Sequence, residues 1–182
     1  MKCVAVIVLC CAVLPVAAEP ARWQIDYAAS RLGFAAEQAG AQFNGEFKSF
    51  DADVRFDPNA LGDSSAKVSV ATSSVATANG ERDGILRGTG WFESEAYPNA
   101  TFSTHEFAKT DAGYSAKGEL EIRTVRMPVT FQFTLMESSG RVELKGTAKL
   151  DRLALGLGLG DWADTKWIGK DVDVTVTLVG TR

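Results

Sequence analysis

From Trp23 onward, apolar residues recur at every second position through almost the whole chain. In 129–135, valine, phenylalanine and leucine alternate with threonine and glutamine, and 172–178 repeats the pattern with valine and leucine. A period of two predicts strands with one apolar and one polar face. Many such strands in one chain of 182 residues predict an all-β fold, either a sandwich or a closed barrel.

The alternating runs predict nine strands, separated by turns rich in Gly, Asp, Asn and Ser. They cover residues 22–27, 30–36, 43–56, 66–73, 100–108, 113–123, 128–137, 140–151 and 171–179. The turn Ser138-Ser139-Gly140 joins two alternating runs and predicts a hairpin.

Two segments, 76–97 and 155–170, interrupt the strand pattern. In the first, Thr77 or Asn79 is a suitable N-cap for a short helix over 81–87. Glycines at 80 and 84 weaken that helix by about 1 kcal/mol each, so we expect it to pack against the sheet. In the second, glycines alternate with leucines, which predicts a bend or a close approach by another group.

Residues 1–18 have the pattern of a secretory signal peptide: Lys2, an apolar core at 4–13, and small residues at 16–18. We therefore expect two parts, a cleaved signal at 1–18 and one domain at 19–182. All three cysteines lie in the first part, so the exported domain would form no disulfide. The net charge of −4 disfavours nucleic acid as a partner.

Residues suited to catalysis or metal binding are sparse. His105 is the only histidine, and without cysteines in 19–182 it cannot complete a zinc site. Asp51 and Asp53 share a strand face but lack the loop that a calcium site requires. Phosphate-binding and dinucleotide-binding fingerprints are absent from the sequence. We therefore expect a protein that is not an enzyme, has no catalytic or metal-binding residues and requires no cofactor.

One charged cluster accompanies the predicted helix. Arg82, Asp83 and Arg87 are candidates for contacts with the head group of a ligand, because a guanidinium offers a fork of donors. The alternative, which we favour for the cluster as a whole, is a local network of ion pairs that orders the helix.

An ordered set of short motifs is similar to those of the YceI-like family. They are Trp23-Gln24-Ile25-Asp26, Ser30-Arg31-Leu32-Gly33-Phe34, Gly45-Glu46-Phe47, Glu81-Arg82-Asp83, Leu86-Arg87, Trp91-Phe92, Tyr97-Pro98, Thr101-Phe102, Asp151-Arg152 and Trp167-Ile168-Gly169. The resemblance covers nearly all of 19–182. It departs from the family at Trp91, where phenylalanine is common, and at 124–127, where the family usually has a Gly-Val turn.

The resemblance implies an antiparallel lipocalin-like barrel of about eight strands with a short flanking helix. It also implies an exported, periplasmic protein whose cavity holds a long-chain apolar lipid, such as a polyisoprenoid or an isoprenoid quinone. Such binding would serve carriage, storage or sensing. Transient contact with a membrane or a membrane protein, and a homodimer, are further expectations.

Strand parity selects the side chains that would line the barrel. The candidate ligand-binding residues are Phe34, Phe50, Val54, Phe56, Val68, Val70, Phe102, Phe131, Phe133, Val174 and Val176, with Leu86, Trp91 and Phe92 added from the irregular segment. Parity alone does not distinguish a cavity from a core filled by its own side chains.

Three other interpretations remain open. The first is an enzyme that holds an apolar substrate in the barrel. The second is a periplasmic stress-response interaction module with a filled core. The third is an outer-membrane barrel, since apolar-out strands have the same period. The dense charges of Glu143, Lys145 and Lys149 on one strand face argue against the third.

Overall fold

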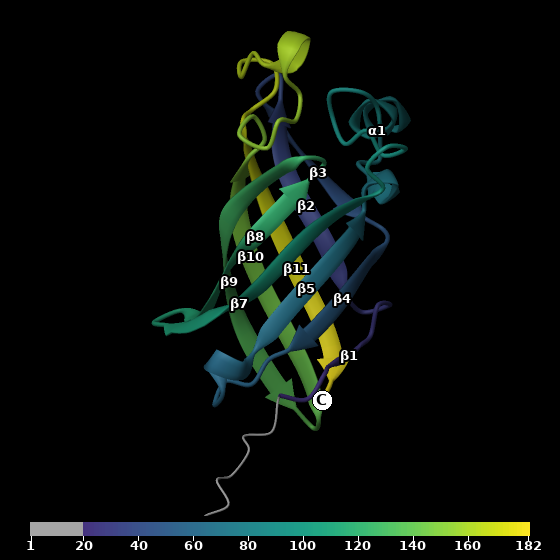
Figure 1. Cartoon of the computed structure of the whole chain (residues 1–182). Helices are drawn as coiled ribbons and strands as arrows, with labels where there is room; N and C mark the ends of the chain where they lie inside the picture. The colour runs from purple at the N-terminus through teal and green to yellow at the C-terminus, as the bar shows by residue number, and fades with distance from the viewer. Residues whose placement is uncertain (1–19) are drawn as a thin grey trace, which may run out of the picture.

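The computed structural model describes residues 20–182, and in this part of the chain eleven antiparallel strands form one sheet that curls into a barrel (Figure 1). The expected signal peptide at 1–18 lies outside the described residues. The strands are β1 (Gln24–Ile25), β2 (Arg31–Gln38), β3 (Ala41–Phe47), β4 (Phe50–Arg55), β5 (Ser65–Ala71), β6 (Val75–Ala76), β7 (Asn99–Thr110), β8 (Gly113–Ile122), β9 (Val125–Ser138), β10 (Arg141–Asp151) and β11 (Asp171–Thr181).

The barrel closes through two bent strands. The predicted strand 43–56 is broken at 48–49 into β3 and β4, and β5 turns through the 3-10 helix Thr72–Ser74 into β6. β4 pairs with β5, and beyond the corner β3 pairs with β6. The Lys48 amide donates to the Ser74 carbonyl across that corner at 3.1 Å. Each bent pair therefore acts as one long strand.

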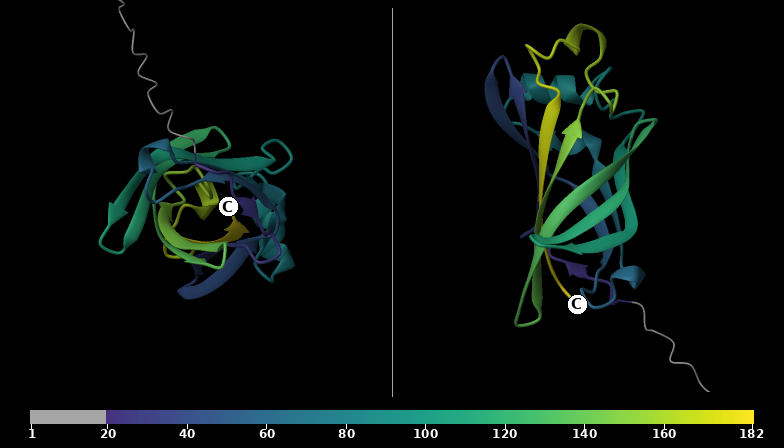
Figure 2. Two further views of the ribbon diagram at one scale, coloured as in Figure 1. Left: turned by 90° about the horizontal axis from the view of Figure 1, so that it is seen from below. Right: turned by 90° about the vertical axis from the view of Figure 1, so that its left-hand side faces the viewer.

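Counted in this way, eight long strands surround the barrel within residues 20–182, and β1 adds a short pairing at the end of β11. The sheet order runs from β4 through β5, β7, β8, β9, β10, β11 and β2 back to β3. The left panel of Figure 2 shows the resulting ring from one end. This architecture confirms the predicted antiparallel barrel and most predicted strands, including the hairpin at 138–140.

The predicted helix is α1 (Gly80–Arg87), which lies beside one end of the barrel (Figure 1). Asn79 is its N-cap, since the side-chain oxygen accepts from the Arg82 amide at 3.0 Å. Leu86 is buried and attaches the helix to the barrel, as the weak intrinsic propensity requires. Among residues 20–182, no helix has the length and apolar character needed to span a membrane.

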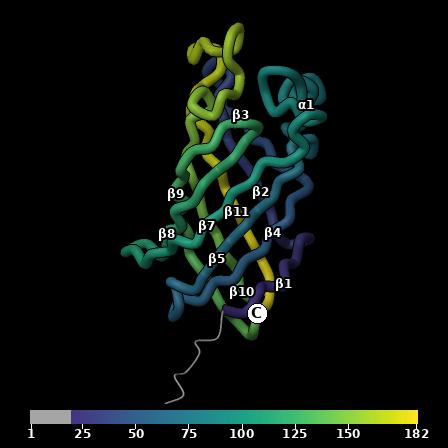
Figure 3. Tube along the Cα trace, viewed as in Figure 1, coloured from purple at the N-terminus to yellow at the C-terminus, as the bar shows by residue number. Residues whose placement is uncertain are grey.

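Two hydrophobic clusters occupy opposite ends of the barrel. One, near the C-terminus, contains Trp23, Phe56 and Val142. The other lies under α1 and the segment 152–170, and contains Leu86 and Leu155. Figure 3 shows that α1 and this segment lie at the same end of the molecule. The end that carries them is called the loop end below, and the other is called the terminal end.

Candidate functional site

An apolar cavity of about 470 Å³ lies inside the barrel. Its volume falls in the range of about 300–1,000 Å³ that is usual for small-molecule sites. Most of its wall comes from inward-facing aliphatic and aromatic side chains of the strands, and the rest from α1 and the two irregular segments. Toward the terminal end the cavity stops at Phe56. The centroid of its ring lies 5.2 Å from the ring centroids of Phe107, Tyr114 and Phe133. These packed rings form its floor.

All of the apolar residues selected from the sequence lie in the wall of this cavity. They are Phe34, Phe50, Val54, Phe56, Val68, Val70, Leu86, Trp91, Phe92, Phe102, Phe131, Phe133, Val174 and Val176. Their role in binding stays a prediction. Strand parity in a closed barrel accounts for the placement of those on strands, but not for Leu86, Trp91 and Phe92, which lie on α1 and in the segment after it. Parity does not reveal the additional wall residues Ile168, Leu155 and Leu157, because they come from the segment without regular strands.

The inward-facing residues of β11 are partly exposed, which indicates unfilled space inside the barrel. Val172, Val174 and Val176 all line the cavity, yet all three are only half-buried. Leu178, two residues further toward the terminal end, is 4% exposed. Inward-facing side chains that retain accessible surface border open space. Leu178 also lines the cavity but retains little accessible surface, so the open space narrows toward the terminal end. The loop half of the barrel therefore holds the cavity, and the terminal half holds a packed core.

Three glycines help to keep aromatic rings against the wall. Phe34 lies directly across from Gly45 in the β2–β3 pair, and a Cβ at Gly45 would overlap its ring. A Cβ at Gly118 would lie 2.6 Å from Cζ of Phe102. A Cβ at Gly146 would lie 2.5 Å from Cζ of Phe131. Each ring thus occupies the space over a missing side chain instead of projecting into the cavity.

The polar part of the cavity wall gathers largely beside α1. Gln38 at the end of β2, and Asn79, Glu81 and Arg82 at the start of α1, line the cavity there. The Arg82 guanidinium stacks on the ring of Phe43 at 4.0 Å and donates to Gln38 Oε1 at 3.0 Å. Because the Gln38, Asn79 and Glu81 side chains are also exposed to solvent, this is the mouth of the cavity.

Arg82 also anchors the helix. Its Nε donates to Thr77 Oγ1 at 2.9 Å, and its Nη2 donates to the Thr77 carbonyl at 3.1 Å. With the bond to Gln38, these contacts leave part of the guanidinium fork unused within residues 20–182. Arg82 is therefore positioned to donate to a further acceptor group at the mouth.

The other two candidate head-group residues lie elsewhere. Asp83 accepts from the Thr77 amide at 2.8 Å and from Thr77 Oγ1 at 2.6 Å, and it does not line the cavity. Arg87 is exposed and also lies outside the wall. Within residues 20–182, no ion pair joins Asp83 to Arg82 or Arg87. The cluster orders α1 through Thr77 rather than through the expected ion-pair network.

Arg152 is a residue of the site to which the sequence assigned no role. It is 2% exposed, and its guanidinium donates five hydrogen bonds to the backbone carbonyls of Leu157, Gly158, Trp162, Ile168 and Gly169. Burial lowers the pKa of Arg152 from its ordinary value, because desolvation disfavours the charged form. Its motif, Asp151-Arg152, gave no sign that one side chain would fix a long loop.

The segment 152–170 approaches the cavity closely at Gly158. This glycine has a φ of +63°, and a Cβ there would lie 2.7 Å from the Trp91 ring. The Trp162 ring meets Trp91 edge to face, with centroids 6.3 Å apart, and also lines the cavity. Both expectations for this segment, a bend and a close approach, are confirmed.

The remaining polar candidates face outward. His105 is exposed on β7, and Asp51 accepts a hydrogen bond from the Tyr27 hydroxyl at 2.7 Å. Asp53 pairs with Arg22 at 2.9 Å. Within residues 20–182, no three His, Cys, Asp or Glu side chains cluster in a way that would hold a metal ion.

A closed antiparallel barrel with one apolar cavity defines the architecture, and comparison with known proteins defines the family. The sequence model of the YceI-like domain matches residues 23–180. The chain therefore belongs to the YceI-like family.

The relatives agree with this assignment. The UPF0312 protein plu2095 of Photorhabdus laumondii is 30% identical over 129 residues, which cover 63% of this chain and 67% of that protein. The chain spans 60% to 67% of the length of the curated relatives it matches.

Among solved structures, BcnA of Burkholderia cenocepacia is 28% identical with a TM-score of 0.83, and the match covers 87% of this chain and 100% of that one. A polyisoprenoid binding domain from Saccharophagus degradans is 18% identical with a TM-score of 0.68, and the match covers 88% and 98%. The second match concerns the fold alone.

Proposed function

We propose that this protein binds one long apolar isoprenoid lipid, a polyisoprenoid or an isoprenoid quinone, inside the barrel and carries it through the periplasm. The observation that carries the proposal is the cavity itself: a nearly continuous apolar wall with most of its polar groups at one mouth. The proposal assigns binding and no catalysis. Storage or sensing would use the same site.

The chemistry of the wall supports a hydrocarbon tail. Each methylene moved from water into such a wall gains about 0.8 kcal/mol. A polyprenyl tail is too apolar to cross an aqueous compartment unaided and needs a protein interior of this kind. The similar fold of a domain described as polyisoprenoid-binding supports the same ligand class.

The polar groups at the mouth of the cavity support a defined orientation of the bound lipid. With the tail against the floor formed by Phe56, Phe107 and Phe133, the head group reaches Arg82 and Gln38 beside α1. The unused donors of Arg82 suit a carbonyl, hydroxyl or phosphate oxygen. In this arrangement Arg82 contacts the head group, whereas Asp83 and Arg87, which lie outside the cavity wall, do not.

The proposal is tested by native mass spectrometry of protein purified from the periplasm without detergent, followed by solvent extraction and lipid identification. We expect one isoprenoid lipid or quinone per protein. A protein that is empty and also rejects added polyprenyl lipid and quinone would overturn the proposal.

A matched pair of glycine variants connects the ligand to the cavity. In Gly45→Ala the new Cβ overlaps the Phe34 ring, which must swing into the cavity and reduce its volume. In Gly62→Ala the new Cβ meets nothing within 4 Å. We expect Gly45→Ala to lose most of its bound lipid and Gly62→Ala to retain it. Equal lipid content in the two variants would place the ligand outside the cavity.

A further inference from the structure

The outer part of the segment 152–170 exposes large apolar side chains. Trp167 is 67% exposed, Leu159 is 52% exposed and Trp162 is 39% exposed. In Figures 1 and 2 this segment forms the extreme tip of the molecule, beyond α1 and the β2–β3 turn. We propose that this tip, residues 159–167, inserts into the interfacial region of a lipid bilayer. The name docking tip is used for these residues below.

The docking tip is held rigidly in this exposed arrangement. The five hydrogen bonds of Arg152 hold the backbone at both ends and inside the tip. The Ala39 amide donates to the Trp167 carbonyl at 2.7 Å, which fixes the tip to the β2–β3 turn. Left-handed glycines at 158 and 160 direct the chain around Leu159. Because the backbone is fixed, these side chains cannot fold back into the core.

The docking tip is continuous with the cavity. Trp162 is part of the cavity wall and of the exposed surface at the same time, and its ring contacts Trp91 inside. A surface that reaches into the mouth places the cavity opening against whatever the tip binds. For an apolar ligand, that position gives a route that avoids water.

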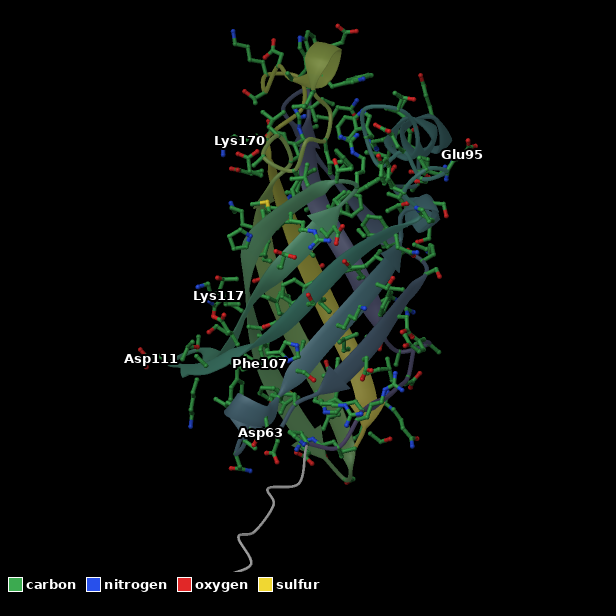
Figure 4. All side chains as sticks on the ribbon, viewed as in Figure 1. Asp63, Glu95, Phe107, Asp111, Lys117 and Lys170 are labelled. Carbon is green, nitrogen blue, oxygen red and sulfur yellow. The ribbon has the colours of Figure 1, made fainter. Side chains whose placement is uncertain are left out.

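The charges of the segment select the bilayer interface as the partner. Within the docking tip, Asp161 and Asp164 outnumber Lys166, so the tip has no excess of basic residues to attract anionic lipids. Tryptophan prefers the headgroup level of a bilayer, where its apolar ring and polar N–H are both accommodated. Figure 4 shows the charged side chain of Lys170 at the base of the segment rather than at its end. Insertion should therefore depend on apolar burial and respond little to salt.

This inference rests on the proposed function for its purpose, since docking would serve exchange of the bound lipid with a membrane. Its physical test is independent of the cargo. The probe is sedimentation of the protein with phosphatidylcholine vesicles, alone and with phosphatidylglycerol added, at low and high ionic strength. We expect binding to both vesicles with little dependence on salt.

The test variant is Leu159→Ser with Trp167→Ser, which changes exposed side chains outside the cavity wall. The matched control is Met136→Ser, at a position 64% exposed on β9 near the terminal end. We expect the double variant to bind vesicles at least about tenfold more weakly, because two apolar side chains leave the interface. The control should bind like the parent protein.

A second measurement reports how deeply the docking tip inserts into the bilayer. Vesicles with bromine on the lipid chains should quench the fluorescence of the parent protein and quench Trp167→Phe less. No quenching, or equal vesicle binding by the double variant and the parent, would overturn the inference. So would a dimer that the double variant converts to monomer, because the tip would then be covered by a second copy.

The two proposals fail separately. A protein that carries lipid in the mass spectrometer but ignores vesicles retains the proposed function and loses the docking tip. A protein that binds vesicles through the tip but holds no lipid does the reverse. If both hold, the double variant should keep its bound lipid and deliver it to vesicles at least about tenfold more slowly.

Discussion

The two ends of this barrel are built from the same strands but are closed by different means. At the terminal end, side chains pack into one cluster, in which Phe56 and Val142 are 1% and 0% exposed. At the loop end, Val174 on β11 faces unfilled space. The difference shows that a cavity in a small barrel depends on where aromatic rings lie. Rings that pack on one another fill the barrel, and rings that lie over glycines leave it open.

The closures also differ in chemistry. The terminal end is closed by aromatic contacts, which are insensitive to local backbone shape. The loop end is covered by a segment without strands, which contains only a short 3-10 helix at Gly160–Trp162. The buried Arg152 donates to five of its backbone carbonyls. A closure that depends on one side chain is easier to disrupt without unfolding the barrel, which suits the end where the proposed ligand would enter.

The largest effect should come from the packed end. Phe56→Ala removes a ring that contacts three other rings, and we expect a loss of about 4 kcal/mol in the free energy of unfolding. Urea denaturation followed by circular dichroism measures it. Phe34→Ala, which removes a ring of the cavity wall, is the control and should cost clearly less. Equal losses would show that the cavity end is packed as tightly as the other.

The second-largest effect should be a loss of stability that is confined to the loop end. Arg152→Met keeps most of the side-chain volume but removes every donor, so five buried or partly buried carbonyls lose their partner. We expect a local loss of about 3 kcal/mol. Amide hydrogen exchange should rise in 155–170 while β9 and β10 remain protected. Uniform exchange through all strands would show instead that Arg152 supports the whole barrel.

Arg152→Lys provides the matching control for charge. It keeps a cation at the same place but has no planar fork, so it can satisfy only some of the carbonyls. We expect its exchange to lie between those of the parent protein and Arg152→Met. Behaviour like the parent would mean that the charge, rather than the set of hydrogen bonds, orders the loop.

Much of the fold could be predicted because its main signal is local. Alternation in 129–135 and 172–178 defines both the strand and the face that turns inward. The corner at 48–49 was missed although the inward-facing parity shifts there, from Phe43 and Phe47 to Phe50 and Val54, and contacts with Ser74 fix the bend. β6 was missed because a strand of two residues shows no period.

The candidate site, like the fold, could be predicted only in part. The apolar wall could be predicted from parity, whereas Phe34 over Gly45 depends on register, which one strand alone does not reveal. Arg152 could not be recognised, because its acceptors are backbone carbonyls up to 17 residues away and no residue type signals them. The charged cluster at α1 was visible, but the separate roles of Arg82 and Asp83 depend on which face of the helix each occupies.

The smallest effect gives the most direct comparison of the two ends, because it uses one chemical change twice. Val142→Ala, at 0% exposure, should cost about 2 kcal/mol, since the deleted methyl groups leave a void among packed neighbours. Val174→Ala removes the same atoms from a wall that already borders empty space, and should cost less than about 1 kcal/mol in lipid-free protein. Added lipid should raise the cost at Val174 alone, because only there does a ligand make the missing contacts. Equal costs in lipid-free protein would mean that the barrel contracts around Val174 in solution.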